Sequence, residues 1–384
     1  MKAFFTMVLL TGCAVAAASA QAQSNQKSQT SPVVVSASTT HTSASAGAAN
    51  GNGKKLEVDG AGTISGVDTI DVPLSDYLSP EGKAAYTAFL KHQFPEAHDI
   101  VEYRKLLDAY ISPTLDKWKE RYPVDVETTT LAGVTVDIIT PKAGIPAKNR
   151  NRILMVLHGG AFMVGEGLGG QNEAVPVAGV GGIKAVSVRY RQGPENRFPA
   201  ASEDVAAVYS ELLKKYRPEN IGIEGCSAGG ILTGQSMVWF QQHKLPRPGA
   251  IGIFCAGLNF SKSGDAKAIS NLLNGKPTAA PSIAPMPYFA GANMNDPLVS
   301  PAVSPEALAK FPPTLFYTGT RDLLMSDAIN GHAKLLKAGV ESHLYITEGW
   351  GHGTPWNSLD APETTDALNV IWNFFDSHLG NDPK

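Results

Sequence analysis

The stretch Gly225-Cys226-Ser227-Ala228-Gly229 combines a residue type and a spacing that suit nucleophilic catalysis. It fits the pattern G-x-S-x-G, in which a sharp turn between a strand and a helix exposes a serine hydroxyl. Glycine is needed on both sides because so tight a turn leaves no room for a side chain there. Since the chain holds 38 glycines, the pattern is informative only if the sequence also supplies partners for the serine.

A nucleophilic serine needs a base to accept its proton and a third group to orient that base. Asp322 follows the apolar residues 314–317, and His352 follows residues 343–346. If both runs are parallel strands, these side chains lie at the carboxyl edge of one sheet, where open α/β sheets build their sites. The order serine, acid, histidine also agrees with this type of serine turn. Asp327 remains an alternative to Asp322 as the orienting acid.

The negative charge that develops on a carbonyl oxygen during attack requires N–H donors near the serine. The backbone N–H of Ala228, directly after the serine, is one candidate. The segment His158-Gly159-Gly160-Ala161 follows a predicted strand and supplies others, because its small residues let the backbone approach a substrate oxygen. We therefore expect an oxyanion loop at this segment.

Strands and helices alternate along the part of the chain that positions these groups. The run 153–157 is apolar throughout, which indicates a strand covered on both faces. Further strands are predicted at 183–188, 221–224, 250–255, 314–317 and 343–346, and helices at 200–216, 229–242, 327–338 and 365–379. A hairpin is predicted over 124–139. This order predicts the α/β class, with a doubly wound, mostly parallel central sheet.

Two segments stand outside the alternation. Residues 72–122 place aromatic and aliphatic residues at helical spacing, which predicts helices whose apolar stripes serve core or interdomain packing. Residues 257–313 are rich in proline and asparagine and are expected to form an insertion above the sheet.

Taken together, the motifs resemble those of the bacterial hormone-sensitive-lipase-like carboxylesterases of the α/β-hydrolase superfamily, over about residues 75–380. The resemblance rests on His158-Gly159-Gly160-Ala161-Phe162, Tyr190-Arg191-Gln192-Gly193-Pro194-Glu195-Asn196-Arg197-Phe198-Pro199-Ala200, the serine turn, Asp296-Pro297, Ser300-Pro301, Asp322-Leu323-Leu324 and Gly351-His352-Gly353. It implies an α/β-hydrolase fold in which residues 72–122, with part of 257–313, form a cap over the site. The implied site residues are the triad Ser227, Asp322 and His352 and the oxyanion amides of Gly160, Ala161 and Ala228.

Two positions depart from the family pattern. The third glycine of the oxyanion loop is Ala161, which keeps the amide but restricts the backbone, and the usual aspartate before the nucleophile is Cys226. Neither change removes a catalytic group. We expect Phe162, Met163 and Trp350 to line the substrate pocket, with structural packing as the alternative for each.

The first residues of the chain resemble an export signal. Met1-Lys2, the apolar residues 3–18 and Ala18-Ser19-Ala20 predict a cleaved signal peptide over residues 1–20, and hence a periplasmic or secreted protein. Leu10-Thr11-Gly12-Cys13 resembles a lipoprotein box, so a lipid anchor at Cys13 is an alternative; no membrane span is expected. Residues 21–68 consist mostly of small and polar residues and predict a disordered linker, which leaves 69–384 for the hydrolase domain.

The composition argues against several other classes of protein. A net charge of −3 without a clustered basic face disfavours a nucleic-acid partner. Gly165, Gly167 and Gly170 match G-x-G-x-x-G, but they begin too far beyond the strand 153–157 for a dinucleotide site. We see no histidine, cysteine or aspartate spacing typical of a metal site, and no cofactor is expected.

The sequence therefore predicts an exported serine hydrolase that cleaves carboxylic esters, with short to medium acyl groups or small alcohol or aryl groups. Its partner is expected to be a small-molecule ester. An amidase or peptidase with the same triad, and a non-catalytic binding module on a hydrolase scaffold, remain alternatives. The sequence gives no prediction of oligomeric state.

Overall fold

The computed structural model describes residues 57–58, 64–65, 72–92, 96–262, 264–273 and 286–380. The predicted signal peptide, the alternative anchor at Cys13 and most of the predicted linker lie outside these residues. The chain divides into two units. In the unit formed by residues 17–73, the short strands β1 (Glu57–Val58) and β2 (Ile64–Ser65) pair antiparallel. All other elements belong to the second unit.

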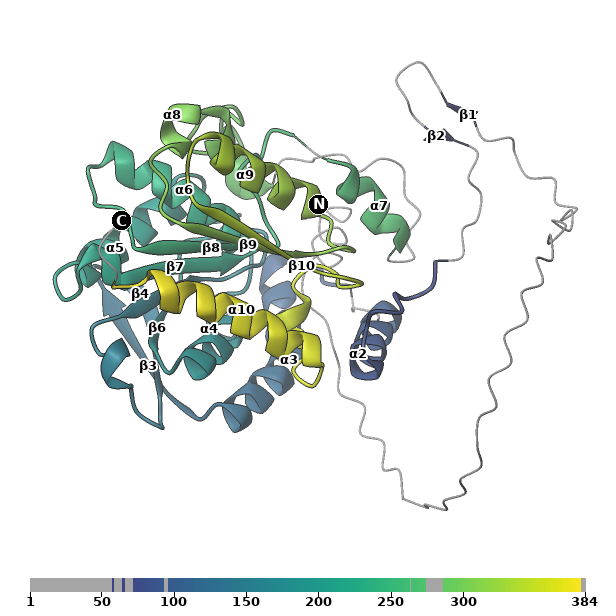
Figure 1. Ribbon diagram of the computed structural model, residues 1–384, viewed down its shortest axis with the longest axis horizontal. Helices are drawn as coiled ribbons and strands as arrows, with labels where there is room; N and C mark the ends of the chain where they lie inside the picture. The colour runs from purple at the N-terminus through teal and green to yellow at the C-terminus, as the bar shows by residue number, and fades with distance from the viewer. Residues whose placement is uncertain are drawn as a thin grey trace, which may run out of the picture. The chain divides into compact units, whose positions relative to one another are not determined.

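An eight-stranded sheet carries the functional groups, with the strand order β10-β9-β8-β7-β5-β6-β4-β3 (Figure 1). The strands are β3 (Val124–Leu131), β4 (Val134–Pro141), β5 (Ile153–Leu157), β6 (Lys184–Val188), β7 (Ile221–Cys226), β8 (Ala250–Phe254), β9 (Thr314–Gly319) and β10 (Ser342–Thr347). From β10 to β6 the neighbours are parallel, and only β4 and β3 run antiparallel to theirs. The predicted doubly wound, mostly parallel sheet is confirmed.

The predicted hairpin is confirmed as β3 and β4. Ala132 and Gly133 connect the two strands with φ angles of 48° and 84°. Two successive positive φ angles are the backbone of the hairpin turn whose twist matches that of paired strands.

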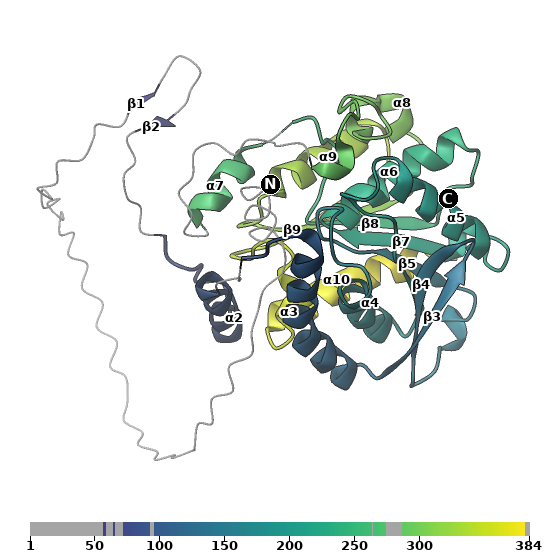
Figure 2. The same ribbon diagram turned by 180° about the vertical axis from the view of Figure 1, so that it is seen from behind.

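Helices cover both faces of the sheet. They are α2 (Pro80–Lys91), α3 (Ile100–Arg121), α4 (Leu168–Gly181), α5 (Ala200–Leu212), α6 (Ala228–Gln242), α7 (Asp265–Leu273), α8 (Pro305–Leu308), α9 (Met325–Lys337) and α10 (Pro362–His378), with short 3-10 helices at Ala147–Asn149, Pro218–Asn220, Pro287–Phe289, Pro301–Val303 and Thr354–Asn357. Helices α3, α4 and α10 pack on one face, and α5, α6 and α9 on the other (Figures 1 and 2). None of the helices in the described part of the chain is long and apolar enough to cross a bilayer.

Strand β5 shows why its sequence is apolar at every position. Ile153, Met155 and Leu157 belong to the core under α5, α6 and α9, whereas Leu154 and Val156 belong to the core under α3, α4 and α10. Successive side chains of a strand point to opposite faces, so a strand covered on both sides buries all of them. This central strand is therefore a fixed base for the loop that follows it.

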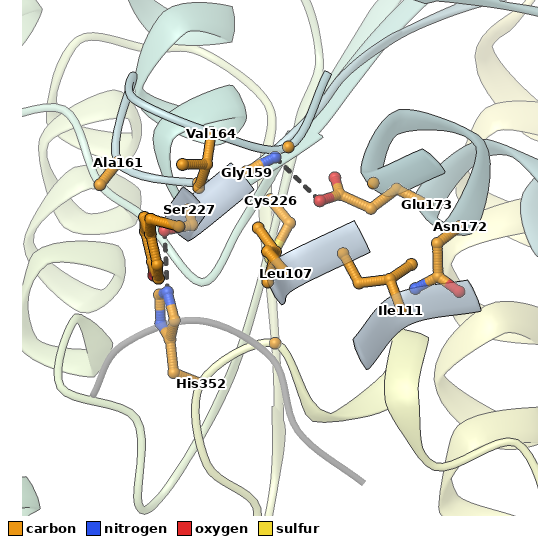
Figure 3. Close-up of a pocket in the computed structure, with 15 residues that line it drawn as sticks. Leu107, Ile111, Gly159, Ala161, Val164, Asn172, Glu173, Cys226, Ser227 and His352 are labelled. Atoms are coloured by element: carbon orange, nitrogen blue, oxygen red, sulfur yellow. Dashed lines mark hydrogen bonds between the residues drawn. The ribbon is translucent and has the colours of Figure 1, made fainter. Parts of the chain in front are cut away.

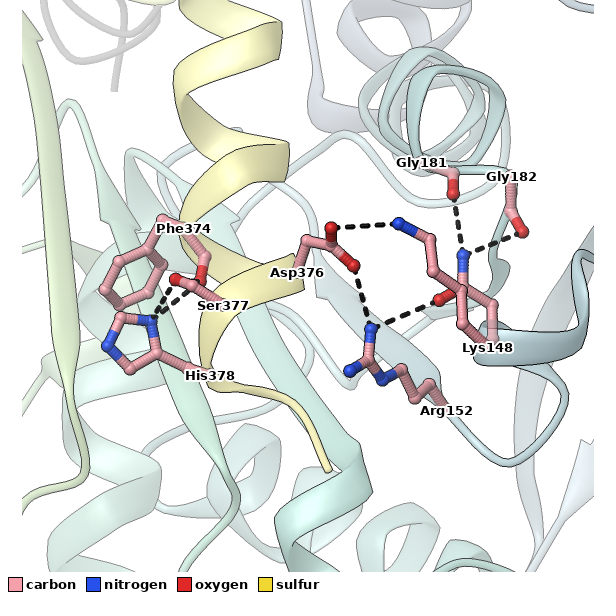
Figure 4. Close-up of polar contacts among 9 residues, drawn as sticks. Lys148, Arg152, Gly181, Gly182, Phe374, Asp376, Ser377 and His378 are labelled. Atoms are coloured by element: carbon pink, nitrogen blue, oxygen red, sulfur yellow. Dashed lines mark hydrogen bonds and ion pairs between the residues drawn. The ribbon is translucent and has the colours of Figure 1, made fainter. Parts of the chain in front are cut away.

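The closing helix α10 is pinned to the chain just before β5. Asp376 on α10 accepts hydrogen bonds from Lys148 Nζ and Arg152 Nη1, each at 2.9 Å (Figure 4). Asn149, between those two residues, donates from Nδ2 to the carbonyl oxygen of Gly181 at the end of α4 (2.9 Å). These contacts join α10, α4 and the start of β5 at the end of the sheet opposite the serine turn.

Candidate active site

Ser227 lies on the sharp turn between β7 and α6, as predicted. Its backbone has φ 56° and ψ −118°, a strained conformation for a residue with a side chain. A Cβ at Gly225 would lie 2.4 Å from the carbonyl oxygen of Leu157, and one at Gly229 would lie 1.7 Å from the same atom. Both glycines are thus required by the close approach of the turn to the end of β5.

The structure brings His352 and Asp322 to this serine. His352 Nε2 lies 2.8 Å from Ser227 Oγ, and His352 Nδ1 lies 2.8 Å from Asp322 Oδ1. Asp322 follows the end of β9 and His352 follows the end of β10, so all three side chains meet at the carboxyl edge of the sheet. The Asp322 carboxylate can only accept a hydrogen bond, so the neutral imidazole of His352 carries its proton on Nδ1. Its Nε2 is then free to accept the proton of the serine.

Asp322 is held as an anion although it is almost fully buried. Burial is the largest single influence and raises the pKa of this carboxyl, but the charge and hydrogen bond of His352 and two further donors together lower it by more. The N–H of Leu324 and the hydroxyl of Thr318 also donate to the carboxylate, at 2.8 and 2.9 Å. The net pKa is below the ordinary aspartate value, so the group keeps the charge that orients a histidine.

Asp327, the alternative orienting acid, lies on α9 and is not the residue that contacts His352. Burial raises its pKa to about 7, and the opposing charge of Lys267 does not reverse this. The spacing in the sequence did not decide which of the two acids orients the histidine. The structure shows that the acid bonded to His352 is Asp322.

The predicted oxyanion loop follows β5 and turns through three positive φ angles, at Gly160 (108°), Ala161 (54°) and Phe162 (57°). The turn is closed by hydrogen bonds from the N–H groups of Met163 and Val164 to the carbonyl oxygen of Gly160, at 2.9 and 3.1 Å. A Cβ at Gly160 would lie 2.1 Å from the carbonyl oxygen of Val164, so glycine is required there. Gly159, Gly160 and Ala161 line the same pocket as Ser227.

Ala228 completes the predicted set of oxyanion donors. It is the first residue of α6, where helical N–H groups have no partner within the helix and the helix dipole favours negative charge. Its position directly after Ser227 places that N–H group beside the serine.

His158 serves the loop as a structural residue. It is fully buried, its ring stacks on Tyr190 at 4.2 Å between centroids, and its carbonyl oxygen accepts from the Tyr190 hydroxyl at 2.7 Å. Burial lowers the pKa of His158 to about 4. The imidazole is therefore uncharged at neutral pH and adds no positive charge to the site.

The pocket beside Ser227 and His352 has a volume of about 50 Å³ and a mostly apolar wall (Figure 3). Helix α3 contributes Tyr103, Leu107 and Ile111, and α4 contributes Asn172 and Glu173. Sequence reasoning missed these residues. The sequence predicts that the apolar stripe on α3 serves packing, because residues that line a pocket and residues that pack in a core repeat with the same helical period.

Phe162, Met163 and Trp350 are expected to line the pocket but are not among the residues that line this one, and all three are buried. The ring of Phe162 stacks on Tyr288 at 4.9 Å between centroids. Met163 belongs to the core under α3, and Trp350 packs with Leu78 and Ala361. Packing, the alternative for each, is what the structure shows.

Two groups of potential metal ligands occur among the described residues. One consists of Asp322 and His352 together with the buried thiol of Cys255, and its carboxylate and imidazole already bond to each other. The other is Glu341, His343 and His378, where Glu341 Oε1 lies 3.0 Å from Nε2 of each histidine. Glu341 and His343 are exposed, and this second group lies at the start of β10, the opposite end from His352.

Comparison with known proteins agrees with this architecture. Residues 154–355 match a family model described as alpha/beta hydrolase fold. The chain is 29% identical to an acetyl-hydrolase of Streptomyces hygroscopicus over 259 residues, which cover 65% of this chain and 84% of that protein. Among solved structures, esterase E25 is similar with a TM-score of 0.70 and 30% identity, covering 81% of this chain and 98% of that one. An esterase from the bacterial hormone-sensitive lipase family has the same fold, with a TM-score of 0.68, 24% identity, and coverage of 79% and 99%.

Proposed function

We propose that Ser227, His352 and Asp322 carry out the reaction of this chain, which belongs to the alpha/beta hydrolase family and is a serine hydrolase of carboxylic esters. Its motifs support a place in the hormone-sensitive-lipase-like branch of that family. The observation that supports this most directly is the chain of two 2.8 Å contacts from Ser227 through His352 to Asp322. A serine, a histidine and a buried carboxylate in this order form an activated nucleophile.

The reaction proceeds in two halves. In the first, His352 Nε2 accepts the proton of Ser227 Oγ while the oxygen attacks the ester carbonyl carbon. The N–H groups of Gly160, Ala161 and Ala228 donate to the oxygen that becomes negative. His352 then gives the proton to the leaving alkoxide, and an acyl group remains bonded to Ser227. In the second half, His352 takes a proton from water, the resulting hydroxide attacks the acyl carbon, and Ser227 regains its proton as the acid leaves.

We propose that the preferred substrates carry short acyl groups. A pocket of about 50 Å³ has room for only a few groups the size of a water molecule, since one water needs roughly 10–15 Å³ of such a cavity. Leu107 and Ile111 from α3 limit it on one side, which supports the proposal that residues 72–122 act as a cap over the site. The name of the Streptomyces relative, an acetyl-hydrolase, agrees with an acyl group of this size.

The assignment is tested by the hydrolysis of p-nitrophenyl acetate by the wild-type protein and two serine variants. Ser227→Ala is expected to lose activity by at least about 10³-fold, since the nucleophile is gone. Ser236→Ala is the control and is expected to keep its activity, because Ser236 lies in α6 outside the pocket lining and its hydroxyl bonds only to the carbonyl oxygen of Leu232. Turnover by Ser227→Ala at the wild-type rate would refute the assignment.

We also propose export of the mature protein, on the basis of the N-terminal sequence described above. Cell fractionation with an antibody tests this, and Cys13→Ala distinguishes its two forms. Release of the wild-type protein in soluble form supports cleavage after the signal. Membrane association that Cys13→Ala abolishes would instead support a lipid anchor.

A further inference from the structure

Glu173 is a buried acid beside the catalytic groups that the proposed reaction does not use. It lies in the second turn of α4, is 8% exposed and lines the pocket with Ser227 and His352. Its Oε1 accepts a hydrogen bond of 2.8 Å from the N–H of Gly159 (Figure 3). Among the described residues, its other oxygen, Oε2, has no hydrogen-bond partner. A buried carboxyl of this kind is costly to keep, which calls for an explanation.

The contacts around Gly159 show what this carboxyl joins. A Cβ at Gly159 would lie 3.2 Å from the carbonyl oxygen of Cys226, 3.2 Å from Glu173 Oε1 and 3.4 Å from the Cβ of Ser227. The oxyanion loop therefore passes between the acid on α4 and the turn that carries the nucleophile. Gly159 directly precedes Gly160 and Ala161, so a bond to its N–H fixes the start of the segment that donates to the substrate.

The sequence offers a reason for a carboxyl at this place. Position 226, where the family pattern has an aspartate, holds a buried cysteine. Glu173 brings a carboxyl toward the same turn from a different element. The N–H of Gly159 and, more weakly, that of Cys226 both act on this carboxyl and partly offset the effect of burial on its pKa.

We propose that Glu173 is a positioning residue for ester hydrolysis, which holds the oxyanion loop at Gly159 in register with Ser227. This inference rests on the proposed function, since it assigns a role within the same site. Glu173 acts through the loop and does not touch the reacting atoms.

The charge of Glu173 matters because the oxyanion forms nearby. Burial raises the pKa of Glu173 to about 8. Glu224 on β7 is also buried, and its pKa is raised to about 8 by burial and by Glu173. The other titratable groups around it are His158 after β5, Tyr190 after β6, the thiol of Cys226 at the end of β7 and, across the pocket, Tyr103 and His352. Burial keeps the first two of these uncharged at neutral pH. The carboxyl is therefore neutral near pH 7, and its ionisation above about pH 8 would place a negative charge beside the developing oxyanion.

Two substitutions separate the hydrogen bond from the charge. Glu173→Gln keeps a carbonyl oxygen for the Gly159 N–H and stays neutral at every pH, whereas Glu173→Leu has neither an acceptor nor a charge. Glu224→Gln is the matched control, because it neutralises the adjacent buried acid, which is not a lining residue of the pocket. Initial rates with p-nitrophenyl acetate are measured from pH 6 to 9.5, with circular dichroism and thermal unfolding to establish that each variant is folded.

We expect Glu173→Leu to lose about 10- to 100-fold in kcat while KM changes by less than about threefold, since oxyanion donors act in the transition state. Glu173→Gln is expected to keep kcat within about threefold at pH 7 and to lose the decline in kcat that the wild-type protein shows above about pH 8. Glu224→Gln should resemble the wild type at pH 7.

The proposal is overturned if Glu173→Leu, folded, keeps the wild-type kcat, or if Glu173→Gln falls as far as Glu173→Leu at pH 7. If Glu173→Leu does not fold, the pH profile of Glu173→Gln decides alone, and a retained alkaline decline overturns the proposal. A wild-type protein without Ser227-dependent esterase activity would instead refute the proposed function, so the two failures are distinguishable.

Discussion

His352 Nε2 and Ser227 Oγ lie 2.8 Å apart although 125 residues separate them in the chain. The contact exists because β7 and β10 end at the same edge of one parallel sheet, and each places its residue on the loop directly after the strand. Two strands, β8 and β9, lie between them, so the loop after β10 must extend back across the sheet edge. Gly349 and Gly353, with φ angles of 76° and 66°, make the turns that this loop needs.

The identity of the orienting acid gives the first prediction. Asp322→Asn keeps the shape of the side chain but removes the charge and favours the wrong histidine tautomer, so kcat should fall by about 10³- to 10⁴-fold. Asp327→Asn, at an acid that does not bond to His352 and is about half protonated at pH 7, should change kcat by less than about threefold. Steady-state kinetics with p-nitrophenyl acetate compares them. An equal loss in both variants would contradict the assignment of Asp322.

The positive φ of Ala161 gives the second prediction. At φ 54° alanine is strained by roughly 1 kcal/mol relative to glycine, and a β-branched residue is strained further. Ala161→Gly should therefore keep kcat within about threefold, whereas Ala161→Val should lower it by at least about 10²-fold by displacing an oxyanion amide. Kinetics and thermal unfolding are measured together. Wild-type kcat in a folded Ala161→Val would show that this amide is not required.

The wall formed by α3 gives the third prediction. Leu107→Ala removes the leucine atoms beyond Cβ and so enlarges the pocket. The ratio of kcat/KM for the hexanoate ester to kcat/KM for the acetate ester should therefore rise by about tenfold, which corresponds to roughly two buried methylene groups. Leu106→Ala, on the same helix but outside the pocket lining, is the control. An unchanged ratio in Leu107→Ala would mean that acyl chains bind elsewhere.

Features of the fold and the site that depend on short stretches of sequence were predicted, whereas features that depend on contacts between distant residues were not. The triad, the serine turn and the oxyanion loop are short segments whose chemistry is local, and strand periodicity orders them along the sheet. The alternation of strands and helices likewise predicted the fold, because a strand buried on both faces leaves a pattern as distinct as that of residues 153–157.

The pocket wall could not be read in this way. The residues that α3 contributes to the wall, Tyr103, Leu107 and Ile111, follow the same helical period as residues that pack in a core. They form a wall because no side chain of another element fills the space beside them. Closeness to the oxyanion loop in the sequence did not predict the packing of Phe162 on Tyr288, because the sequence does not give the direction of a side chain. Glu173 gave no signal, since a single acid is usually exposed and the sequence analysis did not predict the helix that carries it.

The buried acids give the fourth prediction, on stability. Between about pH 6.5 and 8 the unfolded chain has already released the protons of Glu173 and Glu224, while the folded chain retains them, because burial raises both pKa values to about 8. The folded state thus binds more protons, and the free energy of unfolding should fall as pH rises through this window. The opposing effect of His158, whose folded pKa is lowered to about 4 from an unfolded value of 6.5, fades across the lower part of this range as the unfolded histidine loses its proton.

Urea unfolding at several pH values from 6.5 to 8 measures this slope. Glu224→Gln removes one of the two acids and should make the decline shallower. A free energy of unfolding that rises across the window in the wild-type protein would show that the buried carboxyls are ionised in the folded state.

The central claim, that Ser227 forms the acyl bond, is tested most directly by trapping the intermediate. The wild-type protein is mixed with p-nitrophenyl acetate, quenched in acid at early times, and analysed by intact and peptide mass spectrometry. We predict a mass increase of one acetyl group, localised to Ser227 and absent from Ser227→Ala, together with a burst of p-nitrophenol of about one equivalent per protein if deacylation is the slower half. An acetyl group found on another residue, with Ser227 unmodified while substrate turns over, would contradict the account.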